Sequence, residues 1–83
     1  MIDIGDTVKH VPTGETWLVA AVIDSRLYWY GYPFGGYADL SDCLLWEKAN
    51  KKKRLRIIKD VADSYGDNAP QRHCRHILAQ EQK

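Results

Sequence analysis

The period of the apolar residues changes near residue 48, and this change does most to limit what the chain can fold into. Before it, short β-branched and aromatic runs alternate with turn residues, whereas after it apolar residues recur at helical spacing. Strands followed by helices are typical of an α+β fold, and a chain of 83 residues suits one domain. We predict a small five-stranded β-barrel over residues 1–47 and a two-helix hairpin over residues 48–83, packed together as a single domain.

Five short strands are expected in the first part of the chain. The clearest covers residues 16–23, a continuous run rich in β-branched and aromatic residues that predicts burial on both faces over part of its length. So many short strands close together predict a closed or nearly closed barrel of the size of SH3, Tudor and KOW domains. That SH3-like comparison concerns the fold alone. The expected strands are residues 7–10, 16–23, 27–32, 37–40 and 43–46.

Two amphipathic helices are expected in the second part. The first covers about residues 50–65, with Asn50 as its N-cap and Gly66 at its end. The second is capped by Asn68 and carries Pro70 in its first turn. The residues expected to face the core are Leu55, Ile58, Val61, Ala62 and Tyr65 in the first helix, and Cys74, Ile77 and Leu78 in the second.

A row of tyrosines is the most informative feature for function. In an extended strand Tyr28, Tyr30 and Tyr32 share one face, and Leu27 and Trp29 share the other. If Leu27 and Trp29 face the core, the tyrosines form an exposed surface suited to base stacking or to the centre of a protein interface. If the helices cover these rings, the rings belong to the core, and both interpretations stay open. The predicted partner-binding residues are Tyr28, Tyr30, Tyr32, Phe34 and Tyr37.

Charge is divided unevenly along the chain. The net charge is −4 through Trp46 and +5 from Glu47 onward, which gives +1 overall. The most basic segment lies at the start of the first helix and is typical of contact with phosphate groups. A solvated helix face, or attraction of the helix to the acidic barrel, would explain the same segment. The residues predicted to bind nucleic acid in the first case are Lys51, Lys52, Lys53, Arg54 and Arg56.

Metal binding and catalysis are not expected. His73 and His76 are three residues apart and make a poor chelate, while Cys74 between them is expected to point into the core. Cys43 is expected to open a core strand, where thiols are structural. The chain has no Gly-rich phosphate loop and no nucleophile elbow. We therefore predict no metal, no cofactor, no catalytic residue, and two cysteines that remain thiols.

The N-terminal residues and the apolar runs bear on location. Asp3 and Asp6 stand where a secretory signal would carry basic residues. The longest apolar run, residues 17–23, is too short to span a membrane. We expect the protein to act in the cytoplasm without a membrane partner, and the sequence leaves its oligomeric state open.

Four segments of the first 47 residues carry a resemblance. They are Ile4-Gly5-Asp6-Thr7-Val8-Lys9-His10, Pro12-Thr13-Gly14-Glu15-Thr16-Trp17-Leu18-Val19, Gly31-Tyr32-Pro33 and Leu40-Ser41-Asp42-Cys43. Together these segments resemble small uncharacterised proteins of bacteriophage and prophage genomes. The resemblance implies a setting, a phage-encoded protein in the bacterial cytoplasm, and it implies no activity or catalytic residue.

Two functions are consistent with these observations. The first is a non-catalytic phage accessory protein that occupies and inhibits a host protein or nucleoprotein complex, as anti-CRISPR and other anti-defence proteins do. The alternative is a small DNA- or RNA-binding protein that uses the basic helix and the tyrosine face. Salt separates them, because phosphate contacts weaken steeply as salt rises and aromatic protein interfaces change little.

Overall fold

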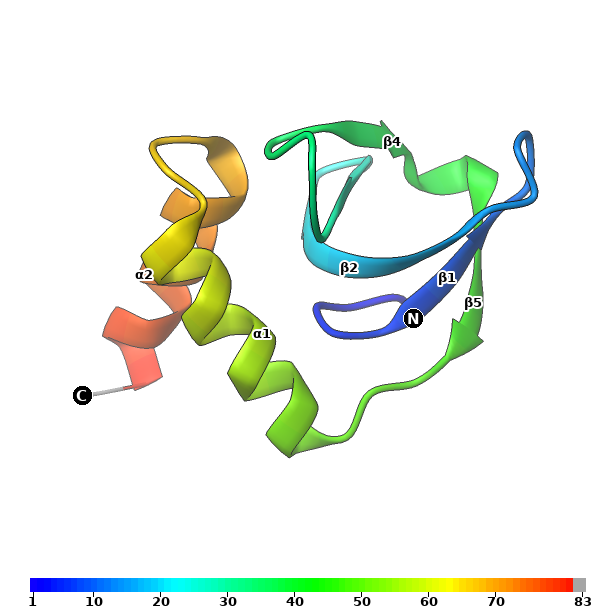
Figure 1. Cartoon of the computed structure of the whole chain (residues 1–83). Helices are drawn as coiled ribbons and strands as arrows, with labels where there is room; N and C mark the ends of the chain where they lie inside the picture. Colours follow the sequence, from blue (N-terminus) through cyan, green and yellow to red (C-terminus); the bar gives the residue numbers. More distant parts are fainter. Residues whose placement is uncertain (82–83) are drawn as a thin grey trace.

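The computed structural model describes residues 1–81 and shows an α+β fold in which an antiparallel sheet lies beside two helices (Figure 1). A 3₁₀ turn, η1 (Leu40–Asp42), links the last two strands. The predicted order of elements is confirmed, although the third strand ends three residues earlier than expected. The elements are β1 (Thr7–His10), β2 (Thr16–Ile23), β3 (Arg26–Trp29), β4 (Tyr37–Asp39), β5 (Cys43–Glu47), α1 (Lys51–Ser64) and α2 (Ala69–Glu81).

The sheet is open. Its strand order is β4-β3-β2-β1-β5, and every neighbouring pair is antiparallel. Of the predicted closed or nearly closed barrel, the closed form is wrong, because β4 and β5 lie at opposite edges and form no ladder with one another in residues 1–81. β4 has three residues before the chain turns into η1, so it leaves little strand for closure. An irregularity in β2 between Val19 and Ala21 adds curvature, which Figure 1 shows.

Two clusters of buried side chains form the core. One lies within the sheet and contains Val8, Val19, Leu27 and Cys43. The other lies between the sheet and the helices. Successive residues of a strand point to opposite faces, so Val19 joins the first cluster and Ala20 joins the second. This confirms that β2 is buried on both faces. The second cluster contains Ile4, Ala20, Ile57, Ile58, Val61, Ala62, Tyr65 and Cys74.

Both helices begin at the predicted caps. The side-chain oxygen of Asn50 accepts a hydrogen bond from the Lys53 N–H at 2.8 Å, which satisfies a free donor of the first turn of α1. Asn68 accepts from the Gln71 N–H at 3.1 Å at the start of α2. Gly66, which follows the C-cap residue Tyr65 of α1, adopts a positive φ of 75°, a conformation that commonly ends helices and that glycine adopts without strain. Neither helix within residues 1–81 is long and apolar enough to cross a membrane.

The buried face of α1 differs from the predicted one at two positions. Leu55 was expected to face the core, but it lies 37% exposed, and Ile57 is buried in its place. The buried arc runs through Ile57, Ile58 and Val61 because α1 packs against α2 and also contacts β2. A helix that faces two neighbours buries a wider and shifted stripe. The other predicted core residues of both helices are confirmed, with Ile77 and Leu78 partly buried against the cluster.

Candidate partner-binding site

The predicted tyrosine face does not form a continuous surface. Tyr28 is only 6% exposed, because it pairs across the sheet with the small side chain of Ala21 and with Tyr37, whose ring centre lies 5.4 Å away. Tyr30 is half-buried beneath the helices. The tyrosine row was expected either to be exposed or to be covered by the helices, and Tyr30 is covered by them. Neither Tyr28 nor Tyr30 is accessible enough to contact a partner.

Tyr30 ties the end of β3 to α1. Its hydroxyl group donates a hydrogen bond to the carboxylate of Asp60, and its ring lies 5.9 Å from that of Tyr65 in a stacked arrangement. The hydrogen bond to Asp60, helped by burial and by the Asp60 charge, raises the pKa of Tyr30 to about 12. Tyr30 therefore remains a neutral hydrogen-bond donor near pH 7, and its role is to hold the end of β3 against α1.

Tyr65 anchors the loop that follows β3. Its hydroxyl oxygen accepts a hydrogen bond from the Gly31 N–H and lies 3.5 Å from the carbonyl oxygen of Trp29. Burial raises the pKa of Tyr65, so the phenol stays protonated. Gly31 has a φ of 128°, which suits glycine. The loop at residues 30–36, which we call the aromatic loop, is thus held by the helical hairpin.

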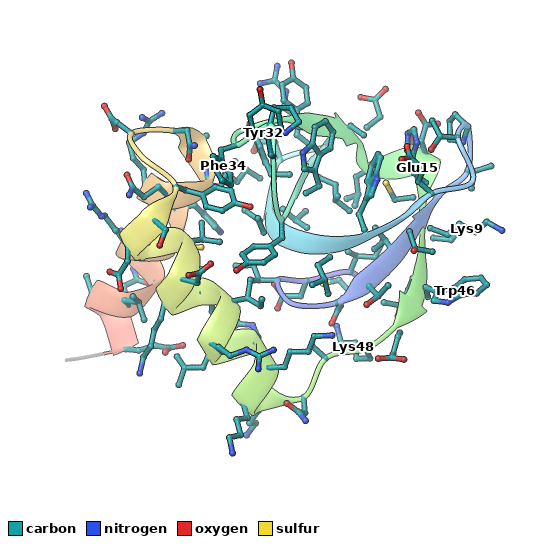
Figure 2. All side chains as sticks on the ribbon, in the orientation of Figure 1. Lys9, Glu15, Tyr32, Phe34, Trp46 and Lys48 are labelled. Atoms are coloured by element: carbon teal, nitrogen blue, oxygen red, sulfur yellow. The ribbon has the colours of Figure 1, made fainter. Side chains whose placement is uncertain are left out.

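The aromatic loop presents two rings to solvent. Tyr32 is 88% exposed and Phe34 is 56% exposed. The two rings meet edge to face with centres 6.2 Å apart, and Phe34 also lies 4.7 Å from the Tyr65 ring. Figure 2 shows both labelled side chains on the side of the sheet where the loop approaches the turn between α1 and α2. Phe34 is supported by the hairpin, whereas Tyr32 is available for contact.

Tyr37 is the fifth predicted contact residue and lies apart on β4. It is about half exposed, and the guanidinium carbon of Arg26 lies 4.5 Å from its ring centre. The ring therefore already has an internal cation on it. The structure brings Tyr32 and Phe34 together as an exposed pair, with Tyr37 as a separate exposed ring.

The basic segment lies at the start of α1, as predicted. Lys51, Lys52 and Arg56 are exposed, while Lys53 and Arg54 are partly buried. The Arg54 Nε lies 3.2 Å from a carboxylate oxygen of Asp3, so this base is engaged within the molecule. An open surface depression of about 490 Å³ lies along the helix. It is lined by Asn50, Lys52, Lys53, Leu55, Arg56 and Lys59, with no acidic residue among them.

A recess between the β1–β2 hairpin and the aromatic loop was not predicted. It has a volume of about 400 Å³ and is lined by Glu15, Trp17, Trp29, Tyr30, Tyr32 and Pro33. The Trp17 and Trp29 rings lie 5.1 Å apart and are tilted by 52°, and His10 stacks on Trp17 at 4.4 Å. Sequence alternation does indicate that Trp17 and Trp29 share a face with the core. It gives no sign that they meet across β2 and β3.

The predicted burial of strand β5 is wrong. Residues 43–46 were expected to form a core strand, but only Cys43 is buried, and Trp46 is 63% exposed beside the exposed Leu44 and Leu45. The Lys9 ammonium nitrogen lies 5.4 Å from the Trp46 ring centre, and Figure 2 shows both side chains on the side away from the helices. β5 is an edge strand, so one of its sides lacks a neighbouring strand in residues 1–81.

The residues considered for metal binding or thiol chemistry do not converge. Within residues 1–81, no group of three His, Cys, Asp or Glu side chains is arranged to hold a metal ion. Cys43 and Cys74 are both free and buried. Burial raises the pKa of Cys43, with the nearby Asp42 charge adding to the effect, and burial raises that of Cys74 to about 11. Both thiols are therefore protonated near neutral pH, which disfavours nucleophilic chemistry.

Comparison of the chain with known protein families, curated proteins and solved structures found no match. The aromatic loop, the basic start of α1 and the recess are thus the surfaces on which a functional assignment can rest.

Proposed function

We propose that this protein is a non-catalytic binding protein that attaches to a partner protein through the aromatic loop, with Tyr32 and Phe34 as its contacts and Tyr37 at the margin. The observation that carries the proposal is the 88% exposure of Tyr32 on a loop held by Tyr65. Large aromatic rings are the side chains that contribute most to protein interfaces. A loop fixed before binding loses less conformational entropy on association.

The proposed setting is a bacterial host cell, where a phage-encoded protein occupies and inhibits a host protein or nucleoprotein complex, as anti-CRISPR and other anti-defence proteins do. It is supported by the resemblance of the four N-terminal segments to phage and prophage proteins. We further propose an SH3-like architecture that is incompletely closed. The placement of β1 between β2 and β5, with η1 between β4 and β5, supports it.

The test is comparative capture from a bacterial lysate. The wild-type protein, Tyr32→Ala and Trp46→Ala would be immobilised in equal amounts, and bound proteins compared by mass spectrometry. Trp46→Ala is the matched control, because it removes an exposed ring that lies well apart from Tyr32 in Figure 2. We expect a protein retained by the wild type and by Trp46→Ala but lost with Tyr32→Ala. Capture that is insensitive to Tyr32→Ala would overturn the proposal.

The captured partner then permits a quantitative test. If Tyr32 is at the centre of the interface, Tyr32→Ala weakens binding by about 2 kcal/mol or more, measured by calorimetry with the purified partner. Phe34→Ala provides a second variant, read together with circular dichroism because this ring also packs on Tyr65. Raising the salt concentration should change the affinity little, as expected for an aromatic contact.

A second candidate function is direct nucleic-acid binding through the basic segment of α1. The supporting observation is that Lys52, Lys53, Arg56 and Lys59 line one depression that contains no acidic side chain. The test is a titration with short single- and double-stranded DNA and RNA at about 50 and 200 mM salt, where each neutralised phosphate of duplex DNA contributes about −0.9 to the log–log slope.

The matched variants are Arg56→Gln and Arg72→Gln, each of which removes one exposed positive charge, the first from α1 and the second from α2, where Arg72 pairs with Asp67. Loss of binding in the first variant alone, with a shallower salt slope, would favour this candidate. An absence of binding at both salt concentrations would leave the basic segment as a solvated helix face.

A further inference from the structure

We propose that the recess between Trp17, Trp29, Tyr32 and Glu15 binds the guanidinium group of an arginine side chain on the partner protein. The inference deepens the proposed function and rests on it, because it names a chemical group that the partner would present beside the aromatic loop. Tyr32 lines the recess and also projects from that loop. Figure 2 shows Glu15 and Tyr32 on the same upper side of the sheet in this view.

The two tryptophans form the aromatic walls of the recess. Their ring centres lie 5.1 Å apart with the planes tilted by 52°, so the rings diverge instead of stacking flat on one another. His10 stacks on Trp17 at 4.4 Å with an angle of 20° between the planes. His10 therefore covers one face of Trp17, and a guanidinium group in the recess would contact the indole rings from the side that faces the recess, not from between them. The recess of about 400 Å³ has room for a planar guanidinium group.

The Trp29 ring is held in place before any ligand arrives. Its Nε1–H donates a hydrogen bond to the Pro33 carbonyl oxygen at 3.2 Å. It also lies against Gly36 so closely that a Cβ atom there would meet the Trp29 Cζ2 at 2.0 Å. A wall fixed by a hydrogen bond and a backbone contact needs little reordering on binding, which favours affinity for a small group.

The charge of the recess selects for a cation. Glu15 is the one carboxylate residue among the six lining residues, none of which is Lys, Arg or His, and the first 46 residues carry a net charge of −4. The two bases of that segment are engaged elsewhere. Lys9 lies over Trp46 at 5.4 Å and Arg26 lies over Tyr37 at 4.5 Å. Each of these two bases thus lies over another aromatic ring. Neither of them supplies a cation to the recess in the described part of the chain.

Arginine fits these features better than lysine does. A guanidinium group is planar and weakly hydrated, so it can stack on an indole face while its N–H groups pair with a carboxylate. The compact ammonium group of lysine is strongly hydrated and offers no flat face to an aromatic ring. Glu15 supplies the carboxylate at the recess, and Trp17 and Trp29 supply the faces.

The test uses three blocked tripeptides, Gly-Arg-Gly, Gly-Lys-Gly and Gly-citrulline-Gly, because citrulline has the shape of arginine without its charge. Each would be titrated into the Trp46→Phe variant, in which indole fluorescence arises from Trp17 and Trp29 alone. We expect saturable binding of the arginine peptide at about millimolar concentration. The citrulline peptide should bind at least about tenfold more weakly, since the cation–π and ion-pair contributions are lost.

Two further variants test whether the guanidinium group of the arginine peptide binds beside Glu15. Glu15→Gln should weaken binding of the arginine peptide several-fold, whereas Glu47→Gln, the same charge change at an exposed position of β5, should not. Both positions are exposed, so circular dichroism should remain that of the wild type. The inference is overturned if the citrulline and arginine peptides bind equally, if the arginine peptide gives no saturable response, or if Glu15→Gln and Glu47→Gln behave alike.

Failure of this inference is distinct from failure of the proposed function. If the arginine peptide does not bind but Tyr32→Ala still abolishes partner capture, the aromatic loop is an interface and the recess is not an arginine site. If the peptide binds and partner capture is unaffected by Tyr32→Ala, the proposed function is wrong and the recess is an arginine site without that partner.

Discussion

The carboxylate of Asp6 lies 2.9 Å from the ammonium nitrogen of Lys48 and accepts a hydrogen bond from the Ala49 N–H at 2.8 Å. A third hydrogen bond comes from the Asp3 N–H at 2.9 Å, and Asp6 itself is only 1% exposed. Burial opposes ionisation, but the hydrogen bonds from Ala49, Lys48 and Asp3 outweigh it and lower the pKa of Asp6. This carboxylate therefore fixes the connection between β5 and α1 to the start of β1.

Replacing Asp6 by Asn should lower the free energy of unfolding by about 1–3 kcal/mol at pH 7, since it removes a charge that accepts three hydrogen bonds. Because the folded-state pKa is lowered, this stabilisation is present above the unfolded-state pKa of about 4 and is lost as the pH falls through the folded-state value. Urea unfolding at several pH values would show the difference between wild type and Asp6→Asn shrinking below about pH 4. Asp63→Asn, at an exposed position of α1, is the control. Equal effects of the two variants would contradict the assigned role.

The hydrogen bond of Tyr30 predicts how the stability of the protein changes at alkaline pH. Its hydrogen bond to Asp60 raises its pKa to about 12, above the ordinary value of 10.0. The resulting stabilisation is complete below pH 10 and is lost as the pH rises through about 12. Tyr30→Phe should therefore cost about 1.5 kcal/mol near pH 7 and less under strongly alkaline conditions. Denaturant unfolding checks this, with the exposed Tyr32→Phe as a control that should cost nothing measurable.

The exposure of Leu55 on α1 can be tested with a pair of truncations on the same helix. Ile58 is fully buried, so Ile58→Ala should destabilise the protein by about 2–4 kcal/mol. Leu55→Ala should cost less than about 1 kcal/mol, because this side chain lies partly in solvent. Thermal unfolding of both variants measures the two losses of stability. Similar losses would mean that Leu55 faces the core, as the sequence predicted, and would contradict the observed packing.

Gly36 supports the Trp29 ring, and this contact predicts a steric effect. Gly36→Ala places a methyl carbon 2.0 Å from the Trp29 Cζ2, so the ring must move and stability should fall by about 1–3 kcal/mol. The indole fluorescence should change with it. The control is a double-mutant cycle with Trp29→Val, in which the cost of Gly36→Ala should largely disappear. An unchanged cost in that background would show that the clash is not with Trp29.

The strands and helices were predictable because they depend on local patterns. Asn50, Gly66 and Asn68 act at the helix ends as their side chains and conformational freedom predict. The continuous run of β2 correctly indicated burial on both faces, since few other structures accommodate such a segment. These features need no knowledge of which element lies beside which.

The parts that could not be predicted depend on neighbours. Alternation places Tyr28 and Tyr30 on one face but does not show that Ala21 leaves room to bury the first, or that α1 covers the second. Likewise, the apolar residues of β5 predict a core strand. Only the strand order shows that β5 lies at an edge of the sheet, with Trp46 exposed to solvent. The recess at Trp17 and Trp29 requires the β2–β3 register, which the sequence does not specify.

The bond between the Gly31 N–H and the Tyr65 hydroxyl has a practical consequence for dissecting this molecule. A fragment that stops at residue 47 would contain every residue of the aromatic loop, yet it would lack the acceptor that holds Gly31 and the ring that supports Phe34. Deletion mapping with such a fragment would report lost binding and misattribute it to contacts made by the missing helices. Single substitutions in the full chain are therefore the appropriate means of locating the interface.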